Sequence, residues 1–187
     1  LQELTISGPI DSIPEHIFNI RTLQVLSFAD CRELKVLSDR ISNLDHLKEL
    51  DISWSRLGTI PDGVFKLKRL EQLTAEHIGM PRLDPRIAEL PKLKTLVLSR
   101  NLLRTLPPEI GECKKLRTLN LRRNRIETLP SEIGGLSNLI YLFMSSNKLS
   151  TLPPGIKGLR NLTRLNLNYN QISSLPATFS YDGILGT

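Results

Sequence analysis

Cysteine is scarce in this sequence, which contains Cys31 and Cys113 and no further thiol among its 187 residues. The two lie far apart, and no cysteine cluster of the kind that caps secreted repeat proteins flanks the chain. Small secreted domains commonly depend on disulfides, so this usage favours a reducing compartment. We therefore expect a cytoplasmic, intracellular protein. A secreted bacterial effector that acts inside a host cell is an alternative with the same chemistry.

Long apolar runs are also absent. No stretch approaches the roughly 18 apolar residues that a membrane-spanning helix needs. The first residues, LQELTISGPI, lack the basic start and apolar stretch of a signal peptide. The sequence therefore predicts no membrane segment. Apolar residues still make up 40% of the chain, which is enough for a continuous packed core.

Motifs for catalysis and for metal binding are missing as well. The sequence has no nucleophile elbow, no phosphate-binding glycine loop and no zinc-protease helix motif. Its three histidines, His16, His46 and His77, do not have the spacing of metal ligands. Cys31 and Cys113 fit buried structural thiols, because an unactivated cysteine behaves as a small apolar residue. We expect no enzyme activity, no cofactor and no metal site.

A repeat of 23 residues dominates what is present. The segments that begin at Leu93, Leu116, Leu139 and Leu162 share the pattern LxxLxLxxNxLxxLPxxIxxLxx. Counting backwards adds two repeats of the same length, one that is a residue longer and one that is a residue shorter. The chain is thus predicted to be a single domain, 1–187, of about eight repeats that start near residues 1, 23, 47, 70, 93, 116, 139 and 162.

This pattern resembles the leucine-rich-repeat family, in the 23-residue LPxxIxxL form of cytoplasmic Ras-suppressor and Scribble-like proteins, plant intracellular proteins and bacterial effectors. The resemblance covers residues 1 to about 180. It implies an α/β solenoid with a curved parallel β-sheet on the concave face. Short 3-10 helices or turns would lie on the convex face. One such fold serves many functions, so the resemblance says little about what the chain does.

Periodicity within each repeat supports the same architecture. The LxL element alternates with a period of two, so the fourth and sixth positions, such as Leu96 and Leu98, should point into the core. After LP, apolar residues such as Ile110 and Cys113 are three apart, which suits a short helical or 3-10 turn on the other side of the core. Because one repeat cannot bury its apolar face alone, neighbouring repeats must stack.

The ninth position of the later repeats carries asparagine. The resemblance implies a structural ladder in which this side chain points inward and bonds backbone groups of the adjacent turn, at Asn101, Asn124, Asn147 and Asn170. The first four repeats place Pro9, Cys31, Ser55 and Ile78 there instead. We expect less regular turns in those repeats, most of all in the turn at 77–81.

The third, fifth, seventh and eighth positions should face solvent and align in columns across the sheet. Aromatic residues make up only 5% of the chain, yet these columns hold its one tryptophan, two of its three tyrosines and a phenylalanine. Aromatic residues and arginines carry much of the energy of protein interfaces. The predicted partner-binding residues are Trp54, His77, Arg100, Arg122, Arg123, Tyr141, Phe143, Arg164 and Tyr169.

Charge is distributed unevenly along the chain. Residues 1–92 contain 12 Lys and Arg against 14 Asp and Glu, a net charge of −2, whereas residues 93–187 contain 13 against 5, a net charge of +8. Acidic residues line the early predicted strands and arginines the later ones. Such a field steers a partner of matching polarity into register. The expected partner is a protein with an acidic surface.

Three functions remain open. The first is a protein–protein interaction module, acting as an adaptor or as the targeting domain of a larger signalling or effector protein. The second is the ligand-sensing domain of an intracellular immune receptor, which the stretch Asp30-Cys31-Arg32-Glu33-Leu34 resembles. The third is nucleic-acid binding by the basic C-terminal half, for which no motif is present. We favour the first.

Both ends of the repeat array lack an obvious cap. Leu1, Leu4 and Ile6 open the first repeat with nothing before them, and the final segment, ATFSYDGILGT, has no cap pattern. Solenoids need polar terminal repeats that shield the last layer of the core. We expect that the natural protein continues beyond at least one end, or that the ends associate with another chain.

Overall fold

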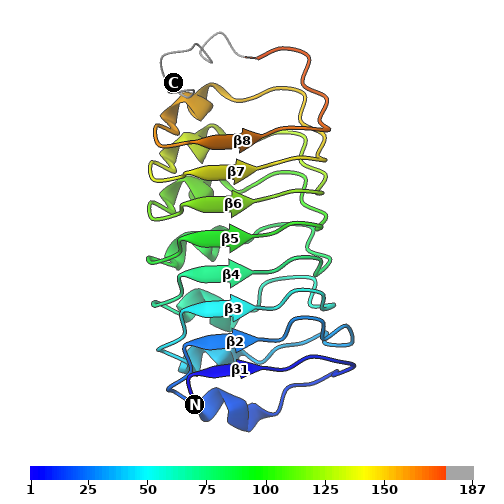
Figure 1. The fold of residues 1–187 in the computed structure, drawn as a ribbon, viewed down its shortest axis with the longest axis vertical. Coiled ribbons are helices and arrows are strands. Elements are labelled where there is room, and N and C mark those ends of the chain that lie inside the picture. The colour runs from blue at the N-terminus through cyan, green and yellow to red at the C-terminus, as the bar shows by residue number, and fades with distance from the viewer. Residues whose placement is uncertain (176–187) are drawn as a thin grey trace.

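A computed structural model describes residues 1–175. Eight short strands form one parallel sheet, in which each strand pairs with the strand of the next repeat (Figure 1). Each strand begins two residues after a predicted repeat start, which confirms the predicted solenoid. The strands are β1 (Glu3–Thr5), β2 (Val25–Ser27), β3 (Glu49–Asp51), β4 (Gln72–Thr74), β5 (Thr95–Val97), β6 (Thr118–Asn120), β7 (Tyr141–Phe143) and β8 (Arg164–Asn166).

Equivalent positions of neighbouring repeats lie opposite each other in the sheet. Leu73 pairs with Leu96, and Leu96 with Leu119. These fourth-position leucines are buried, whereas the third- and fifth-position side chains on either side of them are partly or fully exposed. A side-chain period of two therefore sets one face of the sheet toward the core and the other toward solvent. The register that the sequence predicts is confirmed.

Among residues 1–175, seven 3-10 helices lie behind the sheet, one in each of the first seven repeats (Figure 1). Proline, serine or aspartate precedes each helix. The amide of Cys113 donates to the carbonyl of Ile110 at 3.1 Å and closes the turn over residues 108–112. The three-residue spacing predicted a turn of this kind. The helices are η1 (Glu15–Asn19), η2 (Asp39–Asn43), η3 (Asp62–Lys66), η4 (Pro85–Glu89), η5 (Pro108–Glu112), η6 (Ser131–Gly135) and η7 (Pro154–Gly158).

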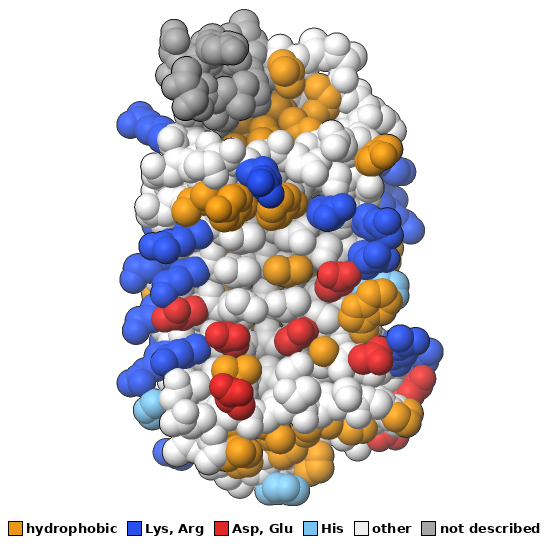
Figure 2. Space-filling view, in the orientation of Figure 1, with side chains coloured by type: hydrophobic (Ala, Val, Ile, Leu, Met, Phe, Trp, Pro, Cys, Tyr) orange, Lys and Arg blue, Asp and Glu red, His pale blue; other side chains and the backbone are white. Residues whose placement is uncertain are grey.

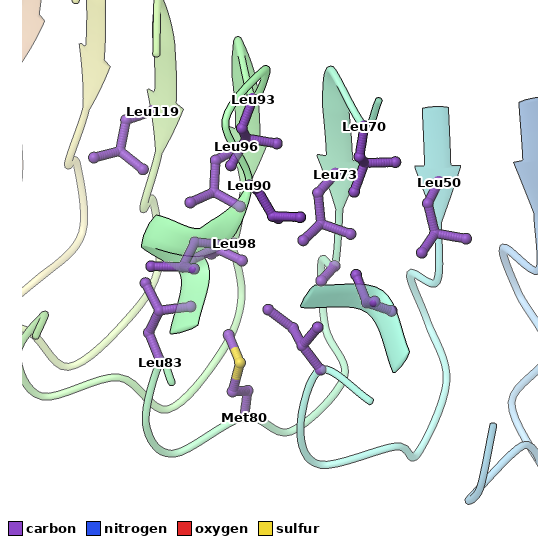
Figure 3. Packing of buried hydrophobic residues seen from close by; sticks show 14 of the residues in the cluster. Leu50, Leu70, Leu73, Met80, Leu83, Leu90, Leu93, Leu96, Leu98 and Leu119 are labelled. Carbon is purple, nitrogen blue, oxygen red and sulfur yellow. The ribbon is translucent and has the colours of Figure 1, made fainter. Parts of the chain in front are cut away.

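The core is a continuous column of apolar side chains between the sheet and the 3-10 helices. Figure 3 shows Leu73, Leu96 and Leu119 side by side, with Leu98 and Met80 closing the layer beneath them. All five are fully buried or nearly so. Burial of one such side chain contributes about 1.5 to 3 kcal/mol, and neighbouring repeats share every layer. Stability is therefore a sum over stacked repeats.

Asparagines at the ninth position form an internal hydrogen-bond ladder. Asn124 donates from Nδ2 to the carbonyls of Leu121 in its own repeat (3.0 Å) and Leu98 in the preceding one (2.9 Å). Its Oδ1 accepts from the amide of Leu103 at 3.1 Å. Asn101, Asn147 and Asn170 repeat this arrangement. Each ladder residue thus fastens two successive repeats to each other.

The early repeats replace this ladder only in part. Cys31 Sγ donates to the carbonyl of Ile6 in the preceding repeat (3.4 Å), and Ser55 Oγ donates to the carbonyl of Ile52 in its own repeat (2.9 Å). Neither side chain supplies the acceptor that an asparagine provides. Apart from the eighth positions, positive φ angles in residues 1–175 occur only at Gly58 and Gly79. The irregular turns expected of the first four repeats therefore appear in the backbone angles of the third and fourth repeats, the turn at 77–81 included, and not in those of the first two.

The first repeat is less deeply buried than those that follow. Leu4 and Ile6 are partly exposed, and Leu1 is 67% exposed. The final segment, 177–187, for which no cap was expected, lies outside the described residues. Within the described part of the chain, no helix has both the length and the apolar character for crossing a membrane.

Candidate functional site

The exposed face of the sheet ends at a row of residues in left-handed backbone conformation. Every eighth position has a positive φ, including 57° at Trp54, 54° at His77 and 59° at Arg100. From Asp30 to Ser146, the amide at the eighth position donates to a carbonyl of the next repeat; Trp54 N, for example, donates to the carbonyl of Glu76 at 2.8 Å. The parallel ladder therefore continues beyond the strands, and the left-handed residue turns the chain toward the buried ninth position. We call this row the strand-end row; it contains Gly8, Asp30, Trp54, His77, Arg100, Arg123, Ser146 and Tyr169.

Three of the predicted partner-binding residues form a cluster in the strand-end row. The Trp54 and His77 rings lie 4.5 Å apart between centroids and are tilted by 44°. The Arg100 guanidinium lies 5.7 Å from the centroid of the Trp54 ring, within reach of a cation–π interaction. Trp54 and His77 also line an open pocket of about 200 Å³ with Arg32 and Arg56. This cluster presents an aromatic surface bordered by arginines, of which Arg32 is paired with Asp30 and Arg56 with Glu33.

A second group lies next along the row, over the ends of β4, β5 and β6. Arg100 Nε bonds to Glu76 Oε1 at 2.9 Å, and Ser99 Oγ donates to Glu76 Oε2 at 2.7 Å. Arg122 Nε donates to Ser145 Oγ at 2.9 Å. Arg100, Arg122 and Arg123 therefore share one surface depression, and Arg100 belongs to both groups.

A third group sits on the sheet itself. The Tyr141 and Phe143 rings project from the same face of β7 and stack nearly parallel, with centroids 6.2 Å apart and an angle of 7°. Tyr141 is 40% exposed. Arg164 of β8 is the register partner of Tyr141, so the sheet carries a cation beside an aromatic pair. Tyr169, at the end of the same row as Trp54, is 85% exposed.

Side chains of different kinds separate clearly on this face (Figure 2). Acidic side chains gather over the early strands, basic side chains follow both edges, and an apolar patch with a basic side chain against it lies at the level of β7. The early acidic residues expected from the sequence include Glu49, Asp51 and Glu76. Asp51 and Glu76 are half-buried. The asymmetry of charge along the sequence thus becomes a gradient along the solenoid.

Two expectations about the exposed columns need correction. The seventh position was expected to face solvent, but Ser53, Ser99 and Ser145 are only 3–5% exposed, because longer neighbouring side chains and backbone cover them. The fifth position is exposed in part, yet Asp51 Oδ1 accepts from the amide of Ser53 at 2.9 Å and Asn120 Oδ1 from that of Arg122 at 3.2 Å. These two side-chain oxygens accept from backbone amides just after the strands, so they are less available to a binding partner.

Neither cysteine is placed for chemistry. Burial, with a smaller effect of Asp30, raises the pKa of the Cys31 thiol above its ordinary value. Burial together with Glu112 raises the pKa of Cys113 to about 11. A reactive thiol requires a lowered pKa, so both remain protonated at neutral pH. Within residues 1–175, no group of three His, Cys, Asp or Glu side chains lies close enough to hold a metal ion.

Sequence reasoning placed the residues of the strand-end row in one column but missed their backbone conformation. Left-handed backbone is uncommon outside glycine, and Trp54 and Tyr169 are bulky residues in which nothing signals it. The same column contains Gly8 and Asp30, and these residue types tolerate a left-handed backbone, so they could have indicated it from the sequence. The surface depression shared by the three arginines was also missed, because its shape depends on Glu76 holding Arg100.

Comparisons with known proteins agree with this architecture. A model for a leucine-rich repeat region matches residues 85–176, and a model for a single leucine-rich repeat matches residues 46–67. No curated protein matches the sequence.

Solved structures match nearly the whole chain. The Leptospira interrogans LRR protein LIC12759 is 26% identical, with a TM-score of 0.71 over 95% of this chain and 57% of its own length. An internalin (inlF) from Listeria monocytogenes is 25% identical, with a TM-score of 0.67 over 93% of this chain and 56% of its own. The structure of PEPR1-AtPEP1 is 29% identical, with a TM-score of 0.68 over 92% of this chain and 24% of that one.

The chain thus spans little more than half of the first two proteins and about a quarter of the third. The repeat pattern, the parallel sheet with its 3-10 helices and these matches all agree. The chain belongs to the leucine-rich-repeat family.

Proposed function

We propose that this chain is a protein-interaction module that binds an acidic surface of another protein through the exposed face of its sheet. It would act as an adaptor or as the targeting part of a larger signalling or effector protein. The observation that carries the proposal is the gathering of aromatic and arginine side chains on this face. Trp54 with His77 and Arg100, and Tyr141 with Phe143, form ready-made contact groups. Residues of these types dominate the energy of protein interfaces.

Similar folds support a protein or peptide partner. One matched structure is the complex named PEPR1-AtPEP1, and another is a TDR receptor, 26% identical with a TM-score of 0.66. These likenesses also favour a second candidate, in which the chain is the ligand-sensing part of a receptor. A receptor of that kind would bind a short peptide with the same face, whereas an adaptor would require a folded partner surface.

The test compares two double variants of equal charge change. Arg122→Glu with Arg123→Glu reverses charge on the sheet side of the solenoid. Lys157→Glu with Arg160→Glu reverses the same charge in η7 and in the turn after it, outside the strands and the strand-end row, and neither side chain makes an ion pair within residues 1–175. Affinity purification followed by quantitative mass spectrometry should show partners that the first variant loses and the second retains, at unchanged melting temperature. Partners retained equally by both variants would refute the proposal.

A separate measurement tests nucleic acid as the alternative binding partner. Binding through phosphate contacts makes labelled RNA or DNA shift in a mobility assay and weakens steeply with salt. We expect no shift at about 150 mM salt. A shift that the Arg122→Glu, Arg123→Glu variant abolishes would favour nucleic acid over protein as the partner.

A further inference from the structure

The depression at the ends of β4, β5 and β6 has the composition of an anion-binding site. Its volume is about 190 Å³, and its opening lies at the strand-end row. Three guanidinium groups and one carboxylate line it, together with a hydroxyl and an amide. The depression, called the anion pocket below, is lined by Glu76, Ser99, Arg100, Asn120, Arg122 and Arg123.

The single carboxylate of the anion pocket is already engaged. Glu76 uses Oε1 for Arg100 (2.9 Å) and Oε2 for Ser99 (2.7 Å), and its side chain is 26% exposed. It therefore fixes the Arg100 guanidinium at one wall. Counting three arginines against one glutamate leaves a net charge of +2 in the pocket. Within residues 1–175, neither Arg122 nor Arg123 forms an ion pair with a carboxylate, and Glu76 pairs with Arg100 alone.

Two of the remaining donor groups, Arg122 and Asn120, are held in place. The Arg122 guanidinium is positioned by its Nε bond to Ser145 Oγ at 2.9 Å, which leaves its terminal nitrogens available. Arg100 N donates to the carbonyl of Arg122 at 2.8 Å, so these two side chains begin from neighbouring, hydrogen-bonded backbone. Asn120 uses its Oδ1 for the amide of Arg122, which leaves its Nδ2 to donate. The anion pocket thus offers hydrogen-bond donors, and the one carboxylate that lines it is already bonded to Arg100 and Ser99.

We infer that the anion pocket binds the phosphoryl group of a phosphorylated side chain on the protein partner. This inference rests on the proposed protein-binding function. A phosphomonoester carries about −1.5 to −2 charges at neutral pH and three acceptor oxygens, which matches the net charge and the three guanidiniums. A carboxylate supplies one charge and two oxygens, so it would leave part of the pocket unneutralised. Guanidinium groups bind both oxyanions in paired hydrogen bonds, and the surplus charge selects the dianion.

The neighbouring strands disfavour a polyanion at this site. A nucleic acid that followed the sheet from the anion pocket toward the N-terminus would meet Glu49 and Asp51 on β3. A peptide with one phosphorylated residue avoids this repulsion. Its adjoining side chains can contact the Trp54 and His77 rings, because Arg100 borders both the anion pocket and the Trp54 ring. One isolated dianion therefore fits the surroundings better than a chain of phosphates.

The experiment uses fluorescence polarisation with three pools of short random peptides whose central residue is phosphoserine, glutamate or serine. We expect the phosphoserine pool to bind roughly tenfold or more tightly than the other two, because charge-assisted hydrogen bonds are the strong ones. Inorganic phosphate should compete with it, and equimolar chloride should not. Equal binding of the phosphoserine and glutamate pools would overturn the inference, and so would displacement by a single-stranded oligonucleotide but not by phosphate.

Two variants and one control complete the design. The Arg123 side chain bonds to no other described residue, so Arg123→Gln should not change folding. Because the variant removes one guanidinium from the anion pocket, its selectivity for phosphoserine should fall roughly tenfold. Arg123→Lys retains the charge but not the paired donors, and should lose less. Arg160→Gln, outside the anion pocket, is the control and should bind as the unmodified chain does. Loss of partner capture in Arg122→Glu, Arg123→Glu with no phosphoserine preference would overturn this inference while leaving the proposed function intact.

Discussion

Single asparagines carry much of the order of the later repeats. The carbonyl of Leu121 accepts from Asn124 in its own repeat (3.0 Å) and from Asn147 in the next (2.9 Å). The carbonyl of Met144 is shared in the same way by Asn147 and Asn170. Each inward carbonyl therefore has two donors, whereas the amide of Ile126 depends on Asn147 Oδ1 alone, at 3.0 Å. The amide is the vulnerable group of the ladder.

Replacement of Asn147 by alanine should destabilise the protein by about 2 to 3 kcal/mol, because it leaves one buried amide without a partner and removes two further bonds. Urea unfolding measures the change. Asn161→Ala is the matched control, since exposed Asn161 donates only to the carbonyl of Ser137 and should cost about 0.5 kcal/mol or less. Equal losses in the two variants would show that the ladder does not contribute as described.

Cys113 makes stability sensitive to alkaline pH. Its thiol pKa is about 11 in the folded chain against 9.0 as the ordinary value, so the thiolate forms more readily in the unfolded chain. The contribution is therefore complete below pH 9 and is lost as the pH rises through about 11. Between these values the unmodified chain should lose roughly 1 to 2 kcal/mol more stability than Cys113→Ala. Parallel pH profiles of urea midpoints for the two proteins would contradict this.

At the level of elements, the 3-10 helices of the late repeats pack so closely that side chains are excluded. A Cβ placed on Gly134 of η6 would meet the carbonyl oxygen of Gly155 in η7, and one on Gly155 would meet that of Ser131. Close backbone approach of this kind requires glycine. The convex side is therefore a second place where neighbouring repeats are matched to each other.

The substitution Gly155→Ala should cost about 1 to 3 kcal/mol, because the added methyl forces η6 and η7 apart. The exposed Lys157→Ala in the same helix serves as control and should change stability by about 0.5 kcal/mol or less. Thermal and urea unfolding both report the difference. If Gly155→Ala unfolds at the same urea concentration as Lys157→Ala, the two helices do not pack as closely as described.

Elements were more predictable from the sequence than the surface they build. Strands and 3-10 helices follow from apolar spacing, which recurs in each 23-residue repeat and leaves one register that buries Leu96 and Leu119 together. The left-handed backbone of Trp54 and the burial of Ser99 have no such periodic signal. Both depend on contacts between repeats, such as the hydrogen bond from Ser99 Oγ to Glu76. Local sequence reasoning does not reach contacts of that kind.

On the scale of the whole molecule, the parallel register converts a sequence gradient into a surface gradient. Because equivalent positions align from β1 to β8, acidic residues of the first half and arginines of the second half lie along one face (Figure 2). An acidic partner, as proposed, would be attracted to the late repeats and repelled by the early ones, so it would dock on the C-terminal half of this face. The column alignment could be read from the sequence. The separation into an aromatic cluster, an anion pocket and the Tyr141–Phe143 pair required side-chain positions.

Site-specific photo-crosslinking shows directly whether partners dock on the exposed face of the sheet. A photoreactive benzoylphenylalanine would replace either Tyr141 on β7 or Lys157 on η7, which lie on opposite sides of the repeat. We expect the probe at 141 to crosslink to the partner and the probe at 157 to give no crosslink. Crosslinks from 157 with none from 141 would contradict this expectation, because the partner would then sit on the convex side.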